Sequence, residues 1–407
     1  MRFRPETIGN AVLLALGGIG YGTLMFVWFS LPAYLSPIID TLGLSGTQAG
    51  ILTGAIPLTY IPLGLLSGLV IDRIGARYGI GIGVALAGLG QFGRAFAADF
   101  PTMLALTLLM GVGATGLTFG LPKLAAELYP SELVGRAASV YLVLSYAGSA
   151  TAFSVGRPIV GPLLGGWRPL FAASGTTAVV FAGVWAVAAW YVPPGQNADD
   201  GDGTFERRSL LADIRAVVRH RDMLLLIVLG TMYLFVLHGI QGWLVTVLET
   251  RGVDPGIAGS VTALLVAGQA VGVVVVPALA ERFDRLRLSI AGCGVVGAVG
   301  ALGLLATPTL VLALAIPVVL VGFGMGGLSP LVRSVPVELE GIGPSLTGTA
   351  VGLIFAIGEI GGFLGPALIG TLRDLTGSFT PGIVLSAAAA IVAALAGVSL
   401  SDLDDAD

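Results

Sequence analysis

Charged residues are scarce in this 407-residue chain, at 11% of the sequence, whereas soluble globular proteins carry about 25%. Hydrophobic residues make up 55%. So low a charge content excludes water as the main solvent of the fold. Apolar runs of roughly 20 residues, enough to cross about 30 Å of hydrocarbon, recur along the whole sequence. We therefore expect an all-α membrane protein in which the lipid bilayer is part of the fold.

Residues that bind metals or carry redox chemistry are also few. Cys293 is the single cysteine, which excludes a disulfide framework and a cluster of thiolate ligands. His220 and His238 are the only histidines, so a zinc or iron site of clustered imidazoles is not expected. The 20 basic residues form no stripe that would bind nucleic acid. We predict no catalytic residues, no metal, no cofactor and no nucleic-acid partner.

Twelve apolar segments lie between polar breaks, and each is long enough for a transmembrane helix. The predicted spans are residues 8–38, 47–70, 78–98, 101–124, 136–163, 168–192, 222–248, 257–280, 288–306, 309–333, 345–371 and 381–400. The first span is too long for a signal peptide and lacks a cleavage site, so we expect it to be retained. The 62 glycines fit this assignment, because small residues let membrane helices approach closely.

The distribution of basic residues predicts the orientation. Fifteen of the 20 basic residues, including Arg333 at the end of a span, fall on one side if both termini are cytoplasmic. We therefore predict a multi-pass protein of the cell membrane with both termini inside. The longest polar stretch, residues 193–221, is predicted to be a cytoplasmic linker, and its segment 210–218 a short amphipathic helix at the membrane surface.

An internal repeat relates the two halves of the chain at an offset of 209 residues. The offset aligns glycines and loop charges as well as apolar positions, and it places Asp72-Arg73 on Glu281-Arg282. Chance similarity among apolar segments is the alternative. Two like-oriented halves predict domains at 1–192 and 222–407, the second with a short acidic tail. They also predict a solute site between the halves.

Two motifs resemble those of the major facilitator superfamily. The segment 68–77, after the second span, matches the superfamily's G-x-x-x-D-R-x-G-x-R loop. A glycine–proline motif follows in the fifth span and is partly echoed at 361–366; its residues are Gly156, Gly161, Pro162, Gly165 and Gly166. This resemblance covers the whole chain. It implies twelve helices in two six-helix bundles that transport a small solute by alternating access, and we expect a monomer.

By that resemblance, the loop 68–77 forms a conformational latch. Asp72, Arg73 and Arg77 would stabilise the outward-facing state by pairing across the cytoplasmic surface, while Gly68 and Gly75 permit close helix approach and a tight turn. The alternative is that the arginines only set the topology. Asp72 favours the latch, because an acidic residue adds nothing to the orientation.

A third resemblance concerns the subgroup. The segments 26–32 and 42–45 resemble nitrate/nitrite and cyanate porters, which implies a small anion. The chain departs from the nitrate carriers, because the apolar parts of its second and eighth spans hold no arginine. It also lacks the fourth-span arginine that is frequent in proton-coupled drug exporters.

Polar residues inside the spans are the candidate substrate and coupling groups, because a charge in hydrocarbon costs several kcal/mol unless it is paired or hydrated. Glu359 lies about 21 Å along its span at 1.5 Å per residue, near the midplane. It is a candidate proton carrier or cation partner. The structural alternative is a protonated acid bonded to Tyr60 or Thr59.

Several other residues are weaker candidates. Arg157 could attract an anion or reach the headgroups, and Arg94 reads as an interface anchor. His238 and Gln241 share one helical face, and Gln269 lies opposite Tyr60 under the repeat. Ligand contact competes here with simple hydrogen bonding between helices. Trp28 is a candidate for lining the pathway, although membrane aromatics more often pack or anchor.

The sequence thus predicts a secondary transporter of a small solute, with small organic or inorganic anions favoured. The alternative is a proton-coupled drug or metabolite exporter. A membrane enzyme would gather acid, base or metal-binding residues at one face, and a sensor would add a soluble domain; neither feature is seen. A channel would not need the charged latch loop. The expected partners are the solute, a coupling proton or ion, and the bilayer.

Overall fold

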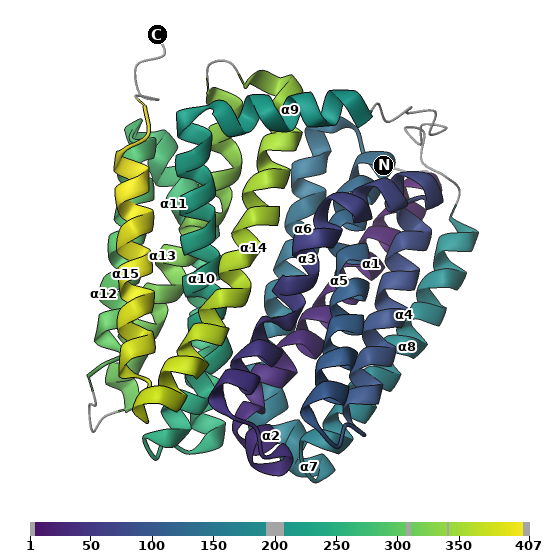
Figure 1. The fold of residues 1–407 in the computed structure, drawn as a ribbon. Coiled ribbons are helices and arrows are strands. Elements are labelled where there is room, and N and C mark those ends of the chain that lie inside the picture. Colours follow the sequence, from purple (N-terminus) through teal and green to yellow (C-terminus); the bar gives the residue numbers. More distant parts are fainter. Residues whose placement is uncertain (1–4, 193–206, 307–310, 340–341, 402–407) are drawn as a thin grey trace. The chain divides into compact units, whose positions relative to one another are not determined.

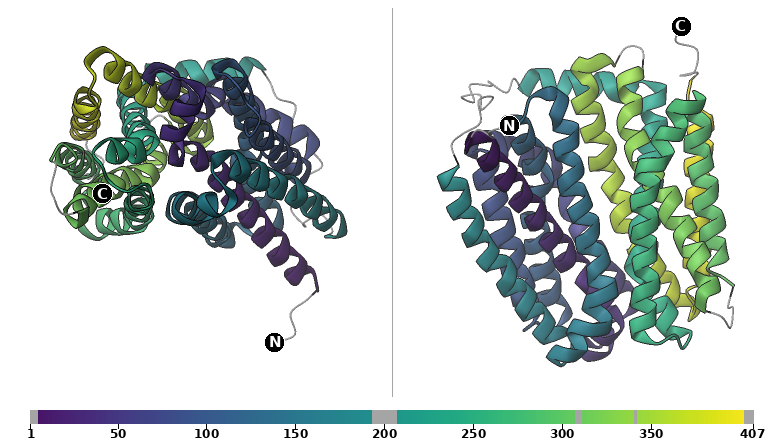
Figure 2. Two further views of the ribbon diagram at one scale, coloured as in Figure 1. Left: turned by 90° about the horizontal axis from the view of Figure 1, so that it is seen from below. Right: turned by 180° about the vertical axis from the view of Figure 1, so that it is seen from behind.

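The computed structural model describes residues 5–192, 207–306, 311–339 and 342–401, and every regular element in these ranges is a helix. The helices form two compact units. Unit 1 comprises Met1–Pro37 and Pro62–Thr204, and unit 2 comprises Ile38–Ile61 and Phe205–Asp407. Within each unit the long helices run alongside one another (Figure 1; Figure 2). Residues 193–206 of the predicted linker and 402–407 of the acidic tail lie outside the described residues.

Unit 1 is built from α1 (Pro5–Ala33), α4 (Ala76–Arg94), α5 (Phe100–Leu128), α6 (Ser131–Thr151), the π-helix η1 (Ala152–Val160), α7 (Gly161–Leu164) and α8 (Trp167–Tyr191). Glycines bring these helices together. A Cβ atom on Gly83 would lie 3.1 Å from the Cα of Gly116 on α5, and one on Gly88 would lie 2.8 Å from the backbone nitrogen of Val179 on α8. The helices therefore pack backbone to backbone, as is usual in lipid.

Unit 2 is built from α10 (Arg221–Thr250), α11 (Pro255–Phe283), α12 (Leu286–Gly303), α13 (Val311–Glu338), α14 (Gly343–Thr376) and α15 (Thr380–Val398). The short helix α9 (Arg207–Arg219) precedes them and confirms the amphipathic helix predicted at 210–218. Two further helices cross from one unit to the other in sequence: α2 (Leu35–Leu42) and α3 (Gly46–Ile74). Helix α3 bends by 67° between Gly64 and Leu66.

The predicted spans correspond to these helices. Ten helices in the described residues are long and apolar enough to cross a membrane, and the bent α3 makes eleven. The twelfth predicted span is α4, which carries Arg77, Gln91 and Arg94 in only 19 residues. The prediction of an all-α membrane protein is confirmed.

Three predicted spans differ from the observed helices: the first, the fifth and the tenth. The first span breaks at Tyr34, between α1 and α2, and the fifth changes from α-helix to π-helix at Ala152. Pro158 has no N–H to donate within that helix, which fits the wider turn. The tenth span does not end at Arg333, because α13 continues to Glu338. Arg333 therefore lies within the helix, and its predicted cytoplasmic side stays a prediction.

Helix starts follow ordinary capping chemistry. Asp99 caps α5 by accepting a hydrogen bond from the Thr102 N–H at 2.9 Å, and Asp254 caps α11 through the Gly256 N–H at 2.8 Å. A proline stands within the first two positions of both helices. Hydrogen bonds from the Thr102 backbone and side chain hold the pKa of Asp99 below its usual range.

Candidate functional site

Glu359 and His238 meet inside unit 2. Glu359 on α14 and His238 on α10 have their Oε2 and Nε2 atoms 3.9 Å apart, and each side chain is 12% exposed. The Glu359 Oε2 atom is buried and accepts no hydrogen bond from the described residues. The Thr59 hydroxyl, a predicted partner, donates to the Ile56 carbonyl of its own helix instead. A buried carboxylate with an open acceptor is a natural position for a proton or a bound cation.

Arg333 on α13 contacts α14, the helix that carries Glu359. Its guanidinium stacks over the Phe355 ring of α14 at 4.3 Å, and Nη1 donates to the Ser329 carbonyl at 2.9 Å and to the Ser329 hydroxyl. Arg333 is exposed, and it is within electrostatic range of the Glu359 carboxylate. No carboxylate in the described part of the chain lies within ion-pair distance of it.

These residues form a unit 2 polar cluster, which comprises Tyr233, His238, Ser329, Arg333, Phe355 and Glu359. The Tyr233 side chain is buried and interacts electrostatically with Arg333 and Glu359. Three helices, α10, α13 and α14, therefore present a cation, a carboxylate, an imidazole and two hydroxyls to one region. Such an arrangement can bind an anion on Arg333 and a proton on Glu359.

Arg333 was missed as a site residue. It lies at the end of an apolar run, so it was interpreted as one of the basic residues that set the membrane orientation. The flanking prolines, Pro330 and Pro336, also favoured a helix end in the sequence, although both lie within α13.

The predicted amides also pair inside unit 2. Gln269 on α11 donates from Nε2 to the Gln241 Oε1 on α10 at 3.4 Å, and both side chains are buried. Gln241 thereby joins α10 to α11. Tyr60 is buried in the part of α3 that belongs to unit 2, and Trp28 is buried in unit 1, where it stacks on Phe29 at 5.6 Å.

The latch loop makes its described contacts within unit 1. Asp72 forms an ion pair with Lys123 of α5 at 2.6 Å. Arg77 donates to the carbonyls of Ala189 and Val192 at the end of α8. A cation there complements the negative end of the helix dipole. Gly75 has φ of 85°, so it adopts the left-handed conformation that a tight turn needs.

The glycine–proline motif surrounds Tyr34. The Tyr34 hydroxyl donates to the Gly156 carbonyl at 2.9 Å in η1, and the Arg157 guanidinium lies 4.6 Å from the Tyr34 ring centre. Gly161 and Pro162 begin α7, and Gly165 and Gly166 have φ of 92° and 124°. Any Cβ atom on Gly161 would collide with the Tyr34 hydroxyl. The motif therefore places Tyr34 against the π-helix, whose Gly156 and Arg157 carbonyls accept hydrogen bonds from the Tyr34 hydroxyl.

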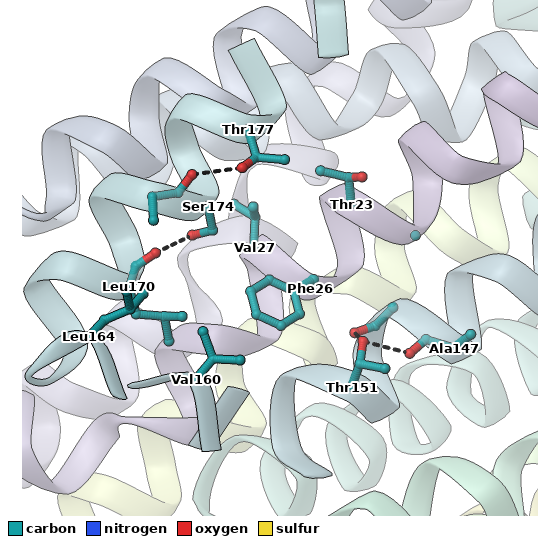
Figure 3. A pocket seen from close by; sticks show the side chains of 13 residues that line it. Thr23, Phe26, Val27, Ala147, Thr151, Val160, Leu164, Leu170, Ser174 and Thr177 are labelled. Atoms are coloured by element: carbon teal, nitrogen blue, oxygen red, sulfur yellow. Dashed lines mark hydrogen bonds between the residues drawn. The ribbon is translucent and has the colours of Figure 1, made fainter. Parts of the chain in front are cut away.

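A cavity of about 440 Å³ lies in unit 1 between α1, α6, η1, α7 and α8 (Figure 3). Phe26, Val27, Leu164 and Leu170 contribute apolar walls. The hydroxyls that line it donate to carbonyls of their own helices; Thr177, for example, donates to Ala173 at 2.9 Å. No charged residue lines the cavity.

Arg94 is not an interface anchor, contrary to the prediction. It is fully buried between α4, α5 and α8, with Nη1 3.0 Å from the Met110 sulfur and the guanidinium 5.1 Å from the Phe171 ring centre. Its Nε and Nη2 atoms have no hydrogen-bond partner in the described residues. The prediction failed because α4 packs between two other helices at this end.

Comparison with known proteins identifies the family. The family model described as the Major Facilitator Superfamily matches residues 17–366. The chain belongs to the major facilitator superfamily. Among curated superfamily proteins, it is 26% identical over 388 residues to a putative tartrate transporter of Agrobacterium vitis, covering 89% of this chain and 86% of the relative. It is 27% identical over 358 residues to the 3-(3-hydroxy-phenyl)propionate transporter of Escherichia coli K12, covering 88% and 85%.

A solved superfamily structure shares the fold. The bacterial homolog of the human lysosomal transporter Spinster, in an inward-facing and unoccupied conformation, superposes with a TM-score of 0.74 over 98% of this chain and 94% of that chain, at 19% identity. The fold is therefore that of the twelve-helix major facilitator proteins. As a member of this superfamily, the protein is a multi-pass secondary transporter of small molecules rather than an enzyme.

Proposed function

We propose that this protein carries small organic anions by alternating access and couples their movement to a proton. The observation that carries the proposal is the unit 2 polar cluster, where an exposed Arg333 has no carboxylate partner among the described residues and lies near Glu359. A guanidinium offers a carboxylate two parallel hydrogen bonds, which is the strongest recognition a single side chain provides.

The relatives support this choice of substrate class. Tartrate and 3-(3-hydroxyphenyl)propionate, named for two of them, are both carboxylates. A carboxylate on Arg333 and a proton on Glu359 compensate each other's charge. Moving the two together transfers less net charge through hydrocarbon than moving the anion alone, which favours symport.

Three finer features belong to the same proposal. Both termini lie in the cytoplasm, in agreement with the distribution of arginines. The functional domains are residues 1–192 and 222–407, joined by the linker 193–221. One chain suffices for transport, because the polar cluster is contributed by a single unit.

The first prediction concerns Arg333. In proteoliposomes, wild-type protein should exchange labelled tartrate or 3-(3-hydroxyphenyl)propionate in a saturable manner. Arg333→Gln should raise the half-saturation concentration roughly 10- to 100-fold, because a hydrogen bond to a charged group contributes about 1.5–3 kcal/mol. Arg333→Lys should recover part of the affinity, since it keeps the charge without the fork of donors.

Arg215→Gln on the surface helix α9 is the matched control and should leave the half-saturation concentration unchanged. Unchanged half-saturation in Arg333→Gln would remove Arg333 from the substrate site. Nitrate and a cationic drug are assayed in parallel. Saturable exchange of the drug without any exchange of anions would favour the exporter alternative over the proposal.

The second prediction concerns proton coupling. Glu359→Gln removes the ionisable group but keeps its size, so accumulation driven by an imposed pH gradient should fall to the level of protein-free liposomes. Counterflow without a gradient should persist, because it needs no net proton movement. His238→Asn should retain gradient-driven accumulation. A Glu359→Gln variant that still accumulates substrate in response to the pH gradient would exclude Glu359 as the proton carrier.

A further inference from the structure

The first part of α3, residues 46–61, packs as a member of unit 2, whereas the rest of the same helix belongs to unit 1. We call residues Gly46–Ile61 the gate segment. The 67° bend of α3 follows within a few residues of the boundary between the units. One continuous helix is thus divided between two compact bodies. Any change in the relative position of those bodies must either move the gate segment off unit 2 or deform α3.

Asp374 of α14 holds the start of the gate segment. Its carboxylate accepts hydrogen bonds from the N–H groups of Gly46 and Thr47, both at 2.7 Å, and from the Thr47 hydroxyl at 2.8 Å. These N–H groups are the free donors of the first helical turn, where the helix dipole favours a negative charge. Such a cap ordinarily comes from the residue directly before the helix. Here it comes from a residue 328 positions away.

The helix supplies the rest of the cap itself. The Ser45 hydroxyl accepts from the Gln48 N–H at 3.1 Å, and the Gln48 Oε1 accepts from the Ser45 N–H at 3.0 Å, which together form a capping box. The gate segment therefore remains a capped helix when Asp374 is removed. Asp374 contributes attachment to α14 rather than helix formation.

The interface beneath this cap is flat. Gly46, Gly50 and Gly54 face Gly370, Pro366 and Phe363 of α14, and a Cβ atom on Gly54 would lie 2.8 Å from the Phe363 carbonyl oxygen. Backbones in such close contact have few interlocking side chains, so the surfaces can separate without rotamer changes. The three hydrogen bonds to Asp374 are then the main specific attachment at this end.

The gate segment covers the Glu359–His238 pair. A Cβ atom placed on Gly362 would contact the Glu359 carboxylate, the His238 Cδ2 at 3.1 Å and the Cβ of Pro57 at 3.1 Å. Pro57, His238 and Glu359 thus converge on one point. Arg333 and Tyr233 are the other titratable groups that act on Glu359, and they come from α13 and α10 rather than from the gate segment.

We propose that Asp374 is a gating residue of the transport cycle. Its carboxylate holds the gate segment over Glu359 and His238. Asp374 must release Gly46 and Thr47 before a solute or proton from the predicted outer side can reach this pair. The inference rests on the proposed function only for the role of Glu359 as proton carrier. Gating by Asp374 does not depend on that role, because any solute that crosses by alternating access needs a gate that opens and closes.

A disulfide across the clamp tests the gate directly. The Thr47 and Thr371 hydroxyls are 3.2 Å apart, so Thr47→Cys with Thr371→Cys places two thiols together. After oxidation with copper phenanthroline, counterflow should fall below about a tenth of the reduced value, and dithiothreitol should restore it. Each single variant should show the same counterflow before and after oxidation, whatever its own level. Full counterflow by the oxidised, cross-linked double variant would overturn the gate.

Asp374→Asn gives the converse measurement. A thiol introduced by Thr53→Cys, buried beside Gly242, should react several-fold faster with an impermeant methanethiosulfonate in Asp374→Asn than in an otherwise wild-type chain. An equal rate would contradict the clamp. The native Cys293 is buried, and the chain without Thr53→Cys supplies its background rate. If the cross-link blocks counterflow while Glu359→Gln still responds to a pH gradient, the gate stands and the coupling proposal fails.

Discussion

At the scale of single residues, an exposed arginine and a buried one have opposite meanings in this chain. Arg333 is exposed, stacks on Phe355 and lies near a carboxylate. Arg94 is fully buried against Phe171 and Met110, and two of its nitrogens have no acceptor in the described residues. A guanidinium that is exposed and partly unbonded can recruit a ligand. One that is sealed in among apolar side chains mainly carries a desolvation cost.

A third prediction follows for Arg94. Arg94→Met keeps an unbranched apolar side chain and removes the buried charge, so the apparent Tm in detergent should stay constant or rise by roughly 2–5 °C. Arg168→Met is the control. The Arg168 guanidinium donates to the Ala95 carbonyl at 2.8 Å and stacks on Trp167, so its removal should lower the apparent Tm. A Tm that falls in Arg94→Met would indicate that a bound anion or water satisfies the guanidinium.

At the scale of helices, glycine has two uses in this chain that the composition does not distinguish. Some glycines mark close backbone contacts, such as Gly148 of α6, where a Cβ atom would run into the Gly22 carbonyl of α1. Others, such as Gly183 of α8, have no atom within 4 Å of that position. Only the first kind holds helices together. The second kind lowers the stability of its helix without a packing benefit, because glycine is a poorer helix former than alanine.

A fourth prediction separates the two kinds. Gly148→Ala should lower the free energy of unfolding by about 1–3 kcal/mol, because the added methyl group forces α1 and α6 apart. Gly183→Ala should be neutral or stabilising by up to about 1 kcal/mol, since it adds helix propensity in open space. Thermal unfolding in one detergent compares the pair. Equal and unfavourable effects would mean that the α1–α6 contact does not depend on glycine.

At the scale of the whole molecule, transport depends on elements that can exchange partners. The latch loop and the gate segment are both ionic or hydrogen-bonded attachments at helix ends. Asp72 binds Lys123 within unit 1, and Asp374 binds the start of α3 within unit 2. Pairing of the latch loop across the cytoplasmic surface remains a prediction. Attachments of this kind are suited to repeated breaking, because they are exposed at helix ends and individually weak.

Much of the fold could be predicted from the sequence because its signals are local. Long apolar runs determine a membrane-spanning helix wherever they occur, and arginine-rich loops orient it. The loop at 68–77 identified the superfamily for the same reason, since its spacing is contained in one segment. The π-helix at Ala152 and the break at Tyr34 escaped prediction, because hydropathy reports apolarity and not the path of the backbone.

The amino-acid sequence by itself determined that this chain spans a membrane and which superfamily it belongs to, because both properties depend on runs of neighbouring residues. Only the tertiary structure decided that Glu359 lies beside His238, that Arg333 stacks on Phe355 of the same helix as Glu359, and that Asp374 caps a helix 328 residues before it. Those contacts depend on which helix faces meet. That choice is made by packing among many similar apolar surfaces, which hydropathy cannot tell apart.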